Sequence, residues 1–106
     1  ICVDSIESAV NAAAGGADRI ELCSALCIGG LTPTTALLCE VKQEVDLPVF
    51  CMIRPREGPS IYSNKEKELM IAEAKALKEC GANGFVFGAL LEDGSIDKQF
   101  CQLLIK

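Results

Sequence analysis

The sequence has 106 residues, of which 50% are hydrophobic and 24% charged, with a formal net charge of −5. A chain of this length forms one domain, here residues 1–106, and its thinly spread basic residues exclude an electrostatic surface for nucleic acid or an anionic membrane. No apolar run approaches the ~20 residues that a transmembrane helix requires.

The expected elements, in chain order, are short apolar strands that alternate with segments of helical spacing. The strands are residues 1–4, 19–23, 49–53 and 84–88. The first helix begins near Ile6 with Ser5 as its cap, and the second has Thr32 as cap and Pro33 as its first residue. The third is capped by Ser63 or Asn64 and runs to Gly81, and the fourth covers residues 96–105. Residues 24–31, with Gly29-Gly30 at the tip, are expected to form a flexible loop.

The β-α order, repeated four times, predicts an α/β fold with a parallel sheet and helical crossovers. Two architectures fit: an open doubly wound sheet, or about four of the eight units of a TIM barrel. The stretch "RIELCS" decides between them, because Ile20 and Leu22 alternate with Arg19, Glu21 and Cys23. Central strands of a doubly wound sheet are continuously apolar, whereas a barrel interior accepts polar layers near its catalytic end. The sequence therefore favours a partial barrel.

Seven cysteines, an odd number without a basic leader, indicate reduced thiols and a cytoplasmic, or also nuclear, protein. The first residues do not resemble a signal peptide, and the absence of an initiating Met indicates a processed or fragmentary chain. No CxxC spacing and no histidine occurs, which argues against a zinc finger.

Side chains that alternate away from the helices on the first three strands are expected to meet inside the barrel. They are Cys2, Asp4, Glu21, Cys23, Met52 and Arg54. Two thiols and a thioether form a soft donor set, which favours Cu(I), and a nearby arginine would lower a thiol pKa. The alternative is that Cys2 and Cys23 only fill the interior as small apolar side chains.

A different function is suggested by Arg54-Pro55-Arg56 at the end of the third strand. Two arginines separated by a proline could bind a carboxylate or phosphate, as in a barrel enzyme that acts on a small anionic metabolite. The alternative is an ion pair of Arg54 with Glu21 or Asp4, and one solvated arginine. Glu21 or Asp4 as a general base is a weak signal, because no histidine or lysine accompanies either on its strand.

Five stretches together resemble the CutC copper-homeostasis family: "ICVDSIESAVNAAAGGADRIELCS", "GGLTP", "PVFCMIRPR", "YS" and "GANGFVFGAL-EDG-ID". They occur in the family's order and spacing from residue 1 to the end of the chain. The resemblance implies a TIM barrel, a cytoplasmic protein without a cofactor that binds Cu(I) and can self-associate. It also implies that Cys2 and Cys23 are the two cysteines at the barrel mouth, and that Arg54 and Glu21 are polar residues of the interior.

The sequence departs from that family pattern in three respects, the first of which is that Cys27, Cys39, Cys51 and Cys80 are not part of it. The family barrel continues through four more strands, one of which bears a histidine, and residues 57–61 replace its usual Gly-Gly-Asp-type turn. We therefore expect a copper-binding protein, rather than an enzyme, that forms homo-oligomers. Cys2, Cys23 and Met52 are its candidate metal ligands, and Asp4, Glu21, Arg54 and Arg56 are the polar residues around them.

Overall fold

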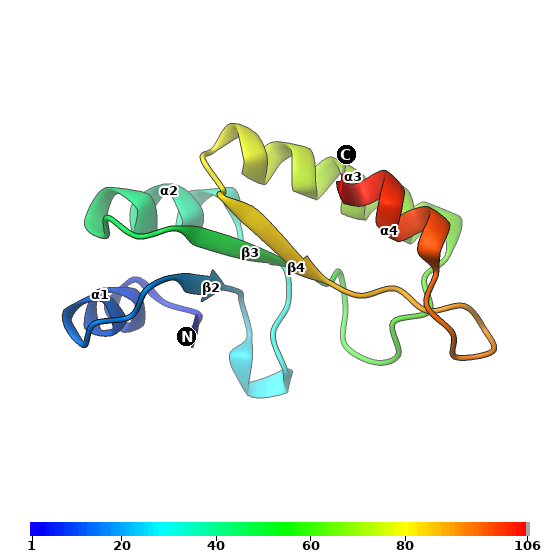
Figure 1. Cartoon of the computed structure of the whole chain (residues 1–106), viewed down its shortest axis with the longest axis horizontal. Coiled ribbons are helices and arrows are strands. Elements are labelled where there is room, and N and C mark those ends of the chain that lie inside the picture. The colour runs from blue at the N-terminus through cyan, green and yellow to red at the C-terminus, as the bar shows by residue number, and fades with distance from the viewer. Residues whose placement is uncertain (106) are drawn as a thin grey trace.

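The computed structural model describes residues 1–105 as four strands and four α-helices that alternate along the chain (Figure 1). The strands are β1 (Cys2–Val3), β2 (Ile20–Leu22), β3 (Val49–Ile53) and β4 (Gly84–Phe87). The helices are α1 (Ile6–Ala14), α2 (Thr35–Glu44), α3 (Asn64–Glu79) and α4 (Lys98–Ile105), with one 3-10 turn, η1 (Leu26–Ile28). The predicted order of elements is confirmed, and η1 is an element that the sequence did not predict.

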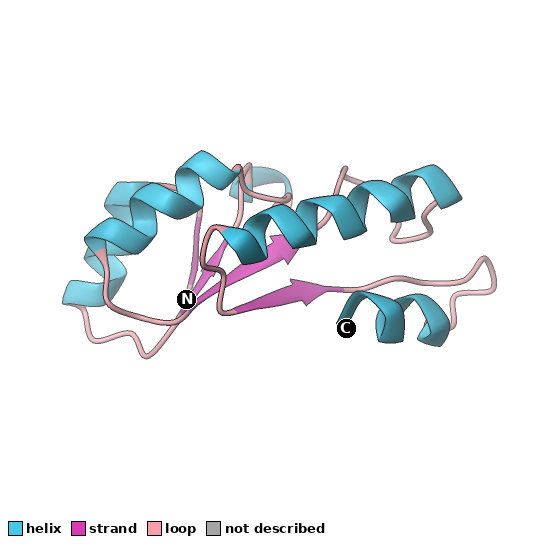
Figure 2. Cartoon of the chain, turned by 90° about the horizontal axis from the view of Figure 1, so that it is seen from above, coloured by secondary structure: helices cyan, strands magenta, loops and turns pink. Residues whose placement is uncertain are grey.

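All four strands are parallel and lie in the order β1-β2-β3-β4. Each crossover therefore advances by one strand in the same direction. Because parallel crossovers are right-handed, such an order puts successive helices on the same face of the sheet. Figure 2 shows α1, α2 and α3 along one side of the strands. The chain is a partial (βα) barrel, as predicted, and the doubly wound alternative is excluded.

The core lies between the sheet and these helices, and the strands contribute alternate residues to it. Along β3, Val49, Cys51 and Ile53 are at most 1% exposed, whereas the residues between them are only partly buried. Ile20 and Leu22 of β2 are fully buried on the same face. Their partners on the helices are Ala9, Leu38, Val41, Met70 and Leu77. The predicted alternation is confirmed in β2 and β3.

Capping residues explain where the helices begin. Ser5 and Ser63 are N-caps as predicted, and each accepts a hydrogen bond from the backbone N–H three residues later. The prediction that Thr32 caps the second helix is wrong. Thr34 is the cap, because Thr32 Oγ1 instead accepts the Arg54 backbone N–H at 2.9 Å.

The fourth helix begins two residues later than expected, at Lys98. Asp97 Oδ1 accepts the Phe100 N–H at 3.2 Å and so occupies the capping position. Its other carboxylate oxygen accepts Lys67 Nζ at 2.8 Å, which connects α4 to α3. Among the described residues, no helix combines the length and the apolar content needed to cross a membrane.

Candidate functional site

The strand register brings three of the predicted side chains into one layer at the carboxyl end of the sheet. Val3 lies opposite Leu22, and Leu22 lies opposite Cys51. The next residues along these strands are Asp4, Cys23 and Met52, and the Cys23 N–H continues the ladder by donating to Val3 O at 3.0 Å. All three belong to the face opposite the helices. The register therefore places these three side chains in one layer, and that they form one site stays a prediction.

Within this layer, the sulfur atoms of Cys23 and Met52 lie beneath Gly30. A Cβ on Gly30 would stand 3.2 Å from Cys23 Sγ and 2.9 Å from Met52 Sδ. Gly30 also has φ +93°, a conformation that L side chains rarely adopt. Both the short distances to the two sulfur atoms and the positive φ require glycine at position 30. The loop backbone therefore lies closely over the two sulfurs. The sequence indicated only a loop at this glycine, although a Gly-Gly pair is a recognised signal for positive φ.

The loop of residues 24–31 is held in place rather than free, contrary to the prediction. Its two ends pair with each other through Ser24 and Leu31, with N···O distances of 2.8 and 2.7 Å. At the start of η1, the Leu26 N–H donates to Asp4 Oδ2 at 3.2 Å. Asp4 therefore anchors η1 to the end of β1, a structural role that the sequence did not indicate.

Arg54 fastens the other side of the same loop. Its Nη1 donates to Gly30 O at 2.9 Å and to Ile28 O at 3.2 Å. Among the described residues Arg54 forms no ion pair with Glu21 or Asp4, so the alternative considered for it is not observed. The carbonyl oxygens of Ile28 and Gly30 are fixed acceptors at the turn. The Arg54 guanidinium donates to both and so holds the loop in position.

Burial determines the electrostatics of Cys23. Its side chain is only 2% exposed, and this burial raises the pKa of the thiol above its ordinary value of 9.0. The negative charges of Asp4 and of a Cys2 thiolate raise the pKa further. The expectation that Arg54 lowers a thiol pKa here is therefore wrong for Cys23, because the guanidinium donates to loop carbonyls instead.

Cys2 and Glu21 lie one layer further from the carboxyl end, where they are paired with each other in the register. Cys2 is exposed, and it reaches Cys23 only along the diagonal between two layers. The charge of Glu21 is met by Arg19, with an Nη2···Oε2 distance of 3.7 Å, and the Arg19 guanidinium stacks 4.9 Å from the Phe50 ring. Arg19 and Glu21, the charged residues of "RIELCS", thus pair with each other.

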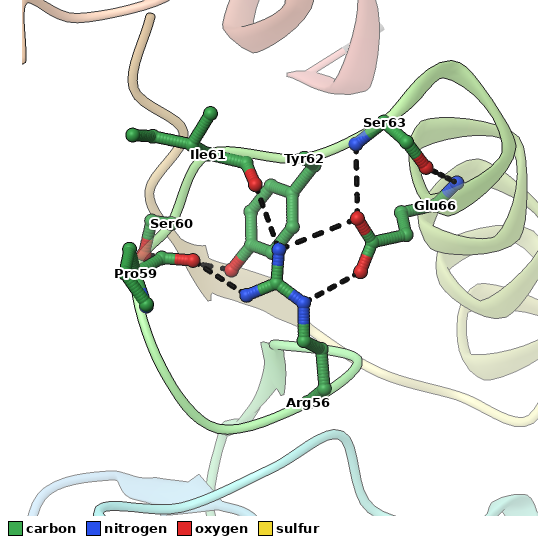
Figure 3. Close-up of polar contacts among 7 residues, drawn as sticks. All are labelled: Arg56, Pro59, Ser60, Ile61, Tyr62, Ser63 and Glu66. Atoms are coloured by element: carbon green, nitrogen blue, oxygen red, sulfur yellow. Dashed lines mark hydrogen bonds and ion pairs between the residues drawn. The ribbon is translucent and has the colours of Figure 1, made fainter. Parts of the chain in front are cut away.

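Arg56 belongs to a separate network at the start of α3 (Figure 3). Its Nε donates to Glu66 Oε2 at 2.6 Å, and Nη2 donates to Ile61 O at 2.7 Å; Nη1 donates to Pro59 O. Its guanidinium also lies 4.9 Å from the Tyr62 ring. Arg54 and Arg56 therefore have different partners within the protein, and a shared anion site stays a prediction.

The donor set defines what this site can hold. Across residues 1–105, no three His, Cys, Asp or Glu side chains are grouped so as to hold a metal ion. A hard-metal or zinc site of that kind is therefore absent from the described part. The sulfurs of Cys23 and Met52, with Cys2 nearby, are a soft pair suited to a monovalent soft ion.

Comparison with known proteins relates the whole chain to one family. The CutC family model matches residues 1–106. The chain is 59% identical over 105 residues to the human copper homeostasis protein cutC homolog, covering 99% of this chain and 38% of that protein. It is 48% identical over 107 residues to the Caenorhabditis elegans homolog, covering 100% and 43%. The chain thus spans well under half the length of these relatives.

Solved structures agree on the fold. The crystal structure of the CutC protein from Streptococcus agalactiae matches with a TM-score of 0.90 at 28% identity, covering 99% of this chain and 51% of that chain. Thiamine phosphate pyrophosphorylase from Pyrococcus furiosus matches with a TM-score of 0.57 at 18% identity, covering 99% and 48%. The second likeness concerns the fold alone.

Proposed function

This chain belongs to the CutC family, and we propose that it serves copper homeostasis by binding Cu(I) at the carboxyl end of β2 and β3. The observation that carries the proposal is the convergence of Cys23 Sγ and Met52 Sδ beneath Gly30. The names of the human and nematode relatives support the role in copper homeostasis.

Cu(I) fits these donors for a chemical reason. It is a soft ion that prefers thiolate and thioether sulfur, whereas Zn²⁺ sites usually add imidazole, which this sequence lacks. In the proposed site, Cys23 supplies a thiolate and Met52 a neutral thioether. Cys2, exposed in the adjacent layer, supplies a second thiolate after a change of rotamer.

The polar residues act around the ligands rather than on the ion. Asp4 and Arg54 hold the loop that covers the sulfurs, through the backbone of Leu26, Ile28 and Gly30. Such supporting contacts fix donor positions, and their loss commonly costs 10- to 100-fold in metal affinity. Glu21 pairs with Arg19 at an Nη2···Oε2 distance of 3.7 Å, and we do not assign it a role in binding. Arg56 is a structural residue of the α3 terminus.

A Cu(I) titration under anaerobic, reducing conditions, with a competing chromophoric chelator, tests the proposal. We expect Cys23→Ser to weaken binding most, the Cys2→Ser/Cys23→Ser double variant to abolish tight binding, and Met52→Leu to weaken it moderately. Cys101→Ser on α4 is the matched control and should bind as the parent does. If the Cys2→Ser/Cys23→Ser variant binds as tightly as the parent, the site assignment fails.

We also propose that the chain associates with itself. Within the described sheet, β1 and β4 each pair on one side only, and unpaired edges favour association. Light scattering over a concentration series tests this, because a monomer at every concentration would contradict it. The cytoplasmic location stays a prediction from the cysteine content.

A further inference from the structure

The thiol on which the proposed copper site depends is closed off from solvent. Cys23 is only 2% exposed, and its Sγ–H donates to Val3 O at 3.6 Å inside the protein. The backbone of Gly30 lies against the sulfur, because a Cβ added there would stand 3.2 Å from Sγ. A buried thiol is inert toward metals and reagents until it is uncovered. An ion therefore reaches Cys23 when the backbone over it moves away.

The segment over Cys23, residues 25–30, joins the rest of the chain through a narrow base. Ser24 and Leu31 form this base through two backbone hydrogen bonds of 2.8 and 2.7 Å. Directly after it, the Thr32 N–H donates to Arg54 O at 3.0 Å, and Thr32 Oγ1 accepts the Arg54 N–H at 2.9 Å. These contacts fix the base to the end of β3. Residues 25–30 can therefore move as a unit while the base keeps its place.

Polar contacts, and not apolar packing, hold this segment down. No residue of η1 is buried, and the side chains of Leu26 and Ile28 are 38% and 41% exposed. The contacts that fasten it are those of Asp4 Oδ2 with the Leu26 N–H and of Arg54 Nη1 with the carbonyls of Ile28 and Gly30. Water can replace hydrogen bonds at the surface, and little apolar area is lost. Opening of this segment alone therefore costs much less than unfolding.

The closed conformation also contains a strained residue. Among residues 1–105, Ala25 is the one residue other than glycine with a positive φ, +51°. Its carbonyl accepts the N–H groups of Ile28 and Gly30 at 3.1 and 3.2 Å, which keeps the segment in one compact turn. A left-handed conformation is unfavourable for a residue that has a Cβ. The closed state therefore carries a cost that opening releases.

We propose that residues 25–30 form a gate over Cys23, which opens about the Ser24–Leu31 pair and admits the metal ion to the thiol. Asp4 and Arg54 are positioning residues of this gate rather than ligands, because both bind its backbone. The inference rests on the proposed function for the identity of the ion, Cu(I). The movement itself requires no metal, so it can be measured on the thiol alone.

The test follows the alkylation of three cysteines by iodoacetamide, with mass spectrometry, on the metal-free full chain with a chelator present. Cys27 is exposed on the gate and reports the unhindered reaction, whereas Cys51 is fully buried in the core and reports global unfolding. We expect Cys23 to react more slowly than Cys27 but faster than Cys51. Cys23 reacting as fast as Cys27, or no faster than Cys51, would overturn the proposal. Because no metal is present, this result does not depend on whether the chain binds Cu(I).

Arg54→Ala should open the gate more often. We expect alkylation of Cys23 to become about tenfold faster, because the gate loses two charge-assisted hydrogen bonds, while the rate at Cys51 stays the same. Loss of a cation does not make a thiol easier to ionise, so a faster reaction reports access. Arg56→Ala, at the start of α3, is the matched control and should leave the rate at Cys23 unchanged. Equal acceleration of Cys23 and Cys51 in Arg54→Ala would mean global unfolding and would overturn the proposal.

Ala25→Gly should act in the opposite direction. Glycine adopts the positive φ of position 25 without strain, which favours the closed gate. We expect alkylation of Cys23 to become severalfold slower, with the rate at Cys27 unchanged. Faster alkylation of Cys23 in Ala25→Gly, or a rate equal to that of the parent, would also overturn the proposal.

Discussion

Cys23 and Met52 come from different strands, yet their sulfur atoms meet under the same glycine. A Cβ added to Gly30 would stand 3.2 Å from the thiol sulfur and 2.9 Å from the thioether sulfur. This contact follows from the register of β2 and β3 and from a loop that Asp4 and Arg54 hold over the strand ends. The pairing of two soft donors under a backbone cover is the basis of the function proposed here.

Gly30→Ala tests the cover directly. The new methyl group would crowd both sulfurs, and the positive φ of +93° would add about 1–2 kcal/mol of backbone strain. We expect lower stability in urea unfolding and weaker Cu(I) binding in the competition titration.

Gly16→Ala is the control for that experiment. Gly16 has nearly the same φ, +92°, but nothing lies within 4 Å of its notional Cβ. Gly16→Ala should lower the stability in urea unfolding through backbone strain, but it should not weaken Cu(I) binding. Equal losses of affinity in the two variants would show that the crowding at Gly30 has no bearing on the metal.

The affinity for Cu(I) should rise with pH. Burial is the main cause that raises the pKa of the Cys23 thiol, so a proton must leave before the thiolate can bind. Between pH 6 and 8 we expect a gain of about tenfold per pH unit for each thiolate that binds. An affinity independent of pH in a non-coordinating buffer would exclude Cys23 as a ligand.

Arg54→Ala should loosen the loop that covers the sulfurs. The carbonyls of Ile28 and Gly30 lose their donor, and we expect faster hydrogen exchange in residues 24–31 with a 10- to 100-fold weaker Kd for Cu(I). Arg56→Ala is the matched control, because Arg56 holds the start of α3 instead. If Arg56→Ala weakens copper binding as much as Arg54→Ala, the effect is not local to the loop.

Glu66→Gln should change how stability depends on pH. The Arg56 hydrogen bond is the main cause that holds the Glu66 pKa below its ordinary value of 4.5, and the Ser63 N–H contributes. A carboxylate with a lowered pKa stabilises the fold above the unfolded-state pKa and loses this contribution as pH falls through the folded-state value. Urea midpoints of parent and Glu66→Gln should therefore differ at pH 7 and converge at acidic pH below 4.5.

Glu68→Gln supplies the comparison for that series. Glu68 lies on the same helix, but its pair with Lys65 spans 3.8 Å between side chains that are 72% and 92% exposed. An exposed pair of this kind contributes little. A difference between parent and Glu66→Gln that stays constant from pH 7 to pH 3 would contradict the ionic account.

The fold could be predicted from the sequence because the spacing of the apolar residues indicates which segments form strands and helices. The alternation of Ile20 and Leu22 with charged neighbours predicted which face of β2 packs on helices, and the burial of β3 follows the same rule. The convergence of Cys23 with Met52 was also predictable, because it needs only the strand register. Hydrogen bonds between side chains and distant backbone were not predictable. Arg54 and Asp4 bind loop groups whose positions depend on the positive φ values of Ala25, Gly29 and Gly30.

Copper K-edge X-ray absorption on the chain loaded with one equivalent of Cu(I) identifies the atoms that bind the ion. We expect only sulfur scatterers in the parent, and replacement of one sulfur by oxygen or nitrogen in Cys23→Ser. Identical spectra for the parent and Cys23→Ser, or a parent site without sulfur, would contradict a copper site built on Cys23 and Met52.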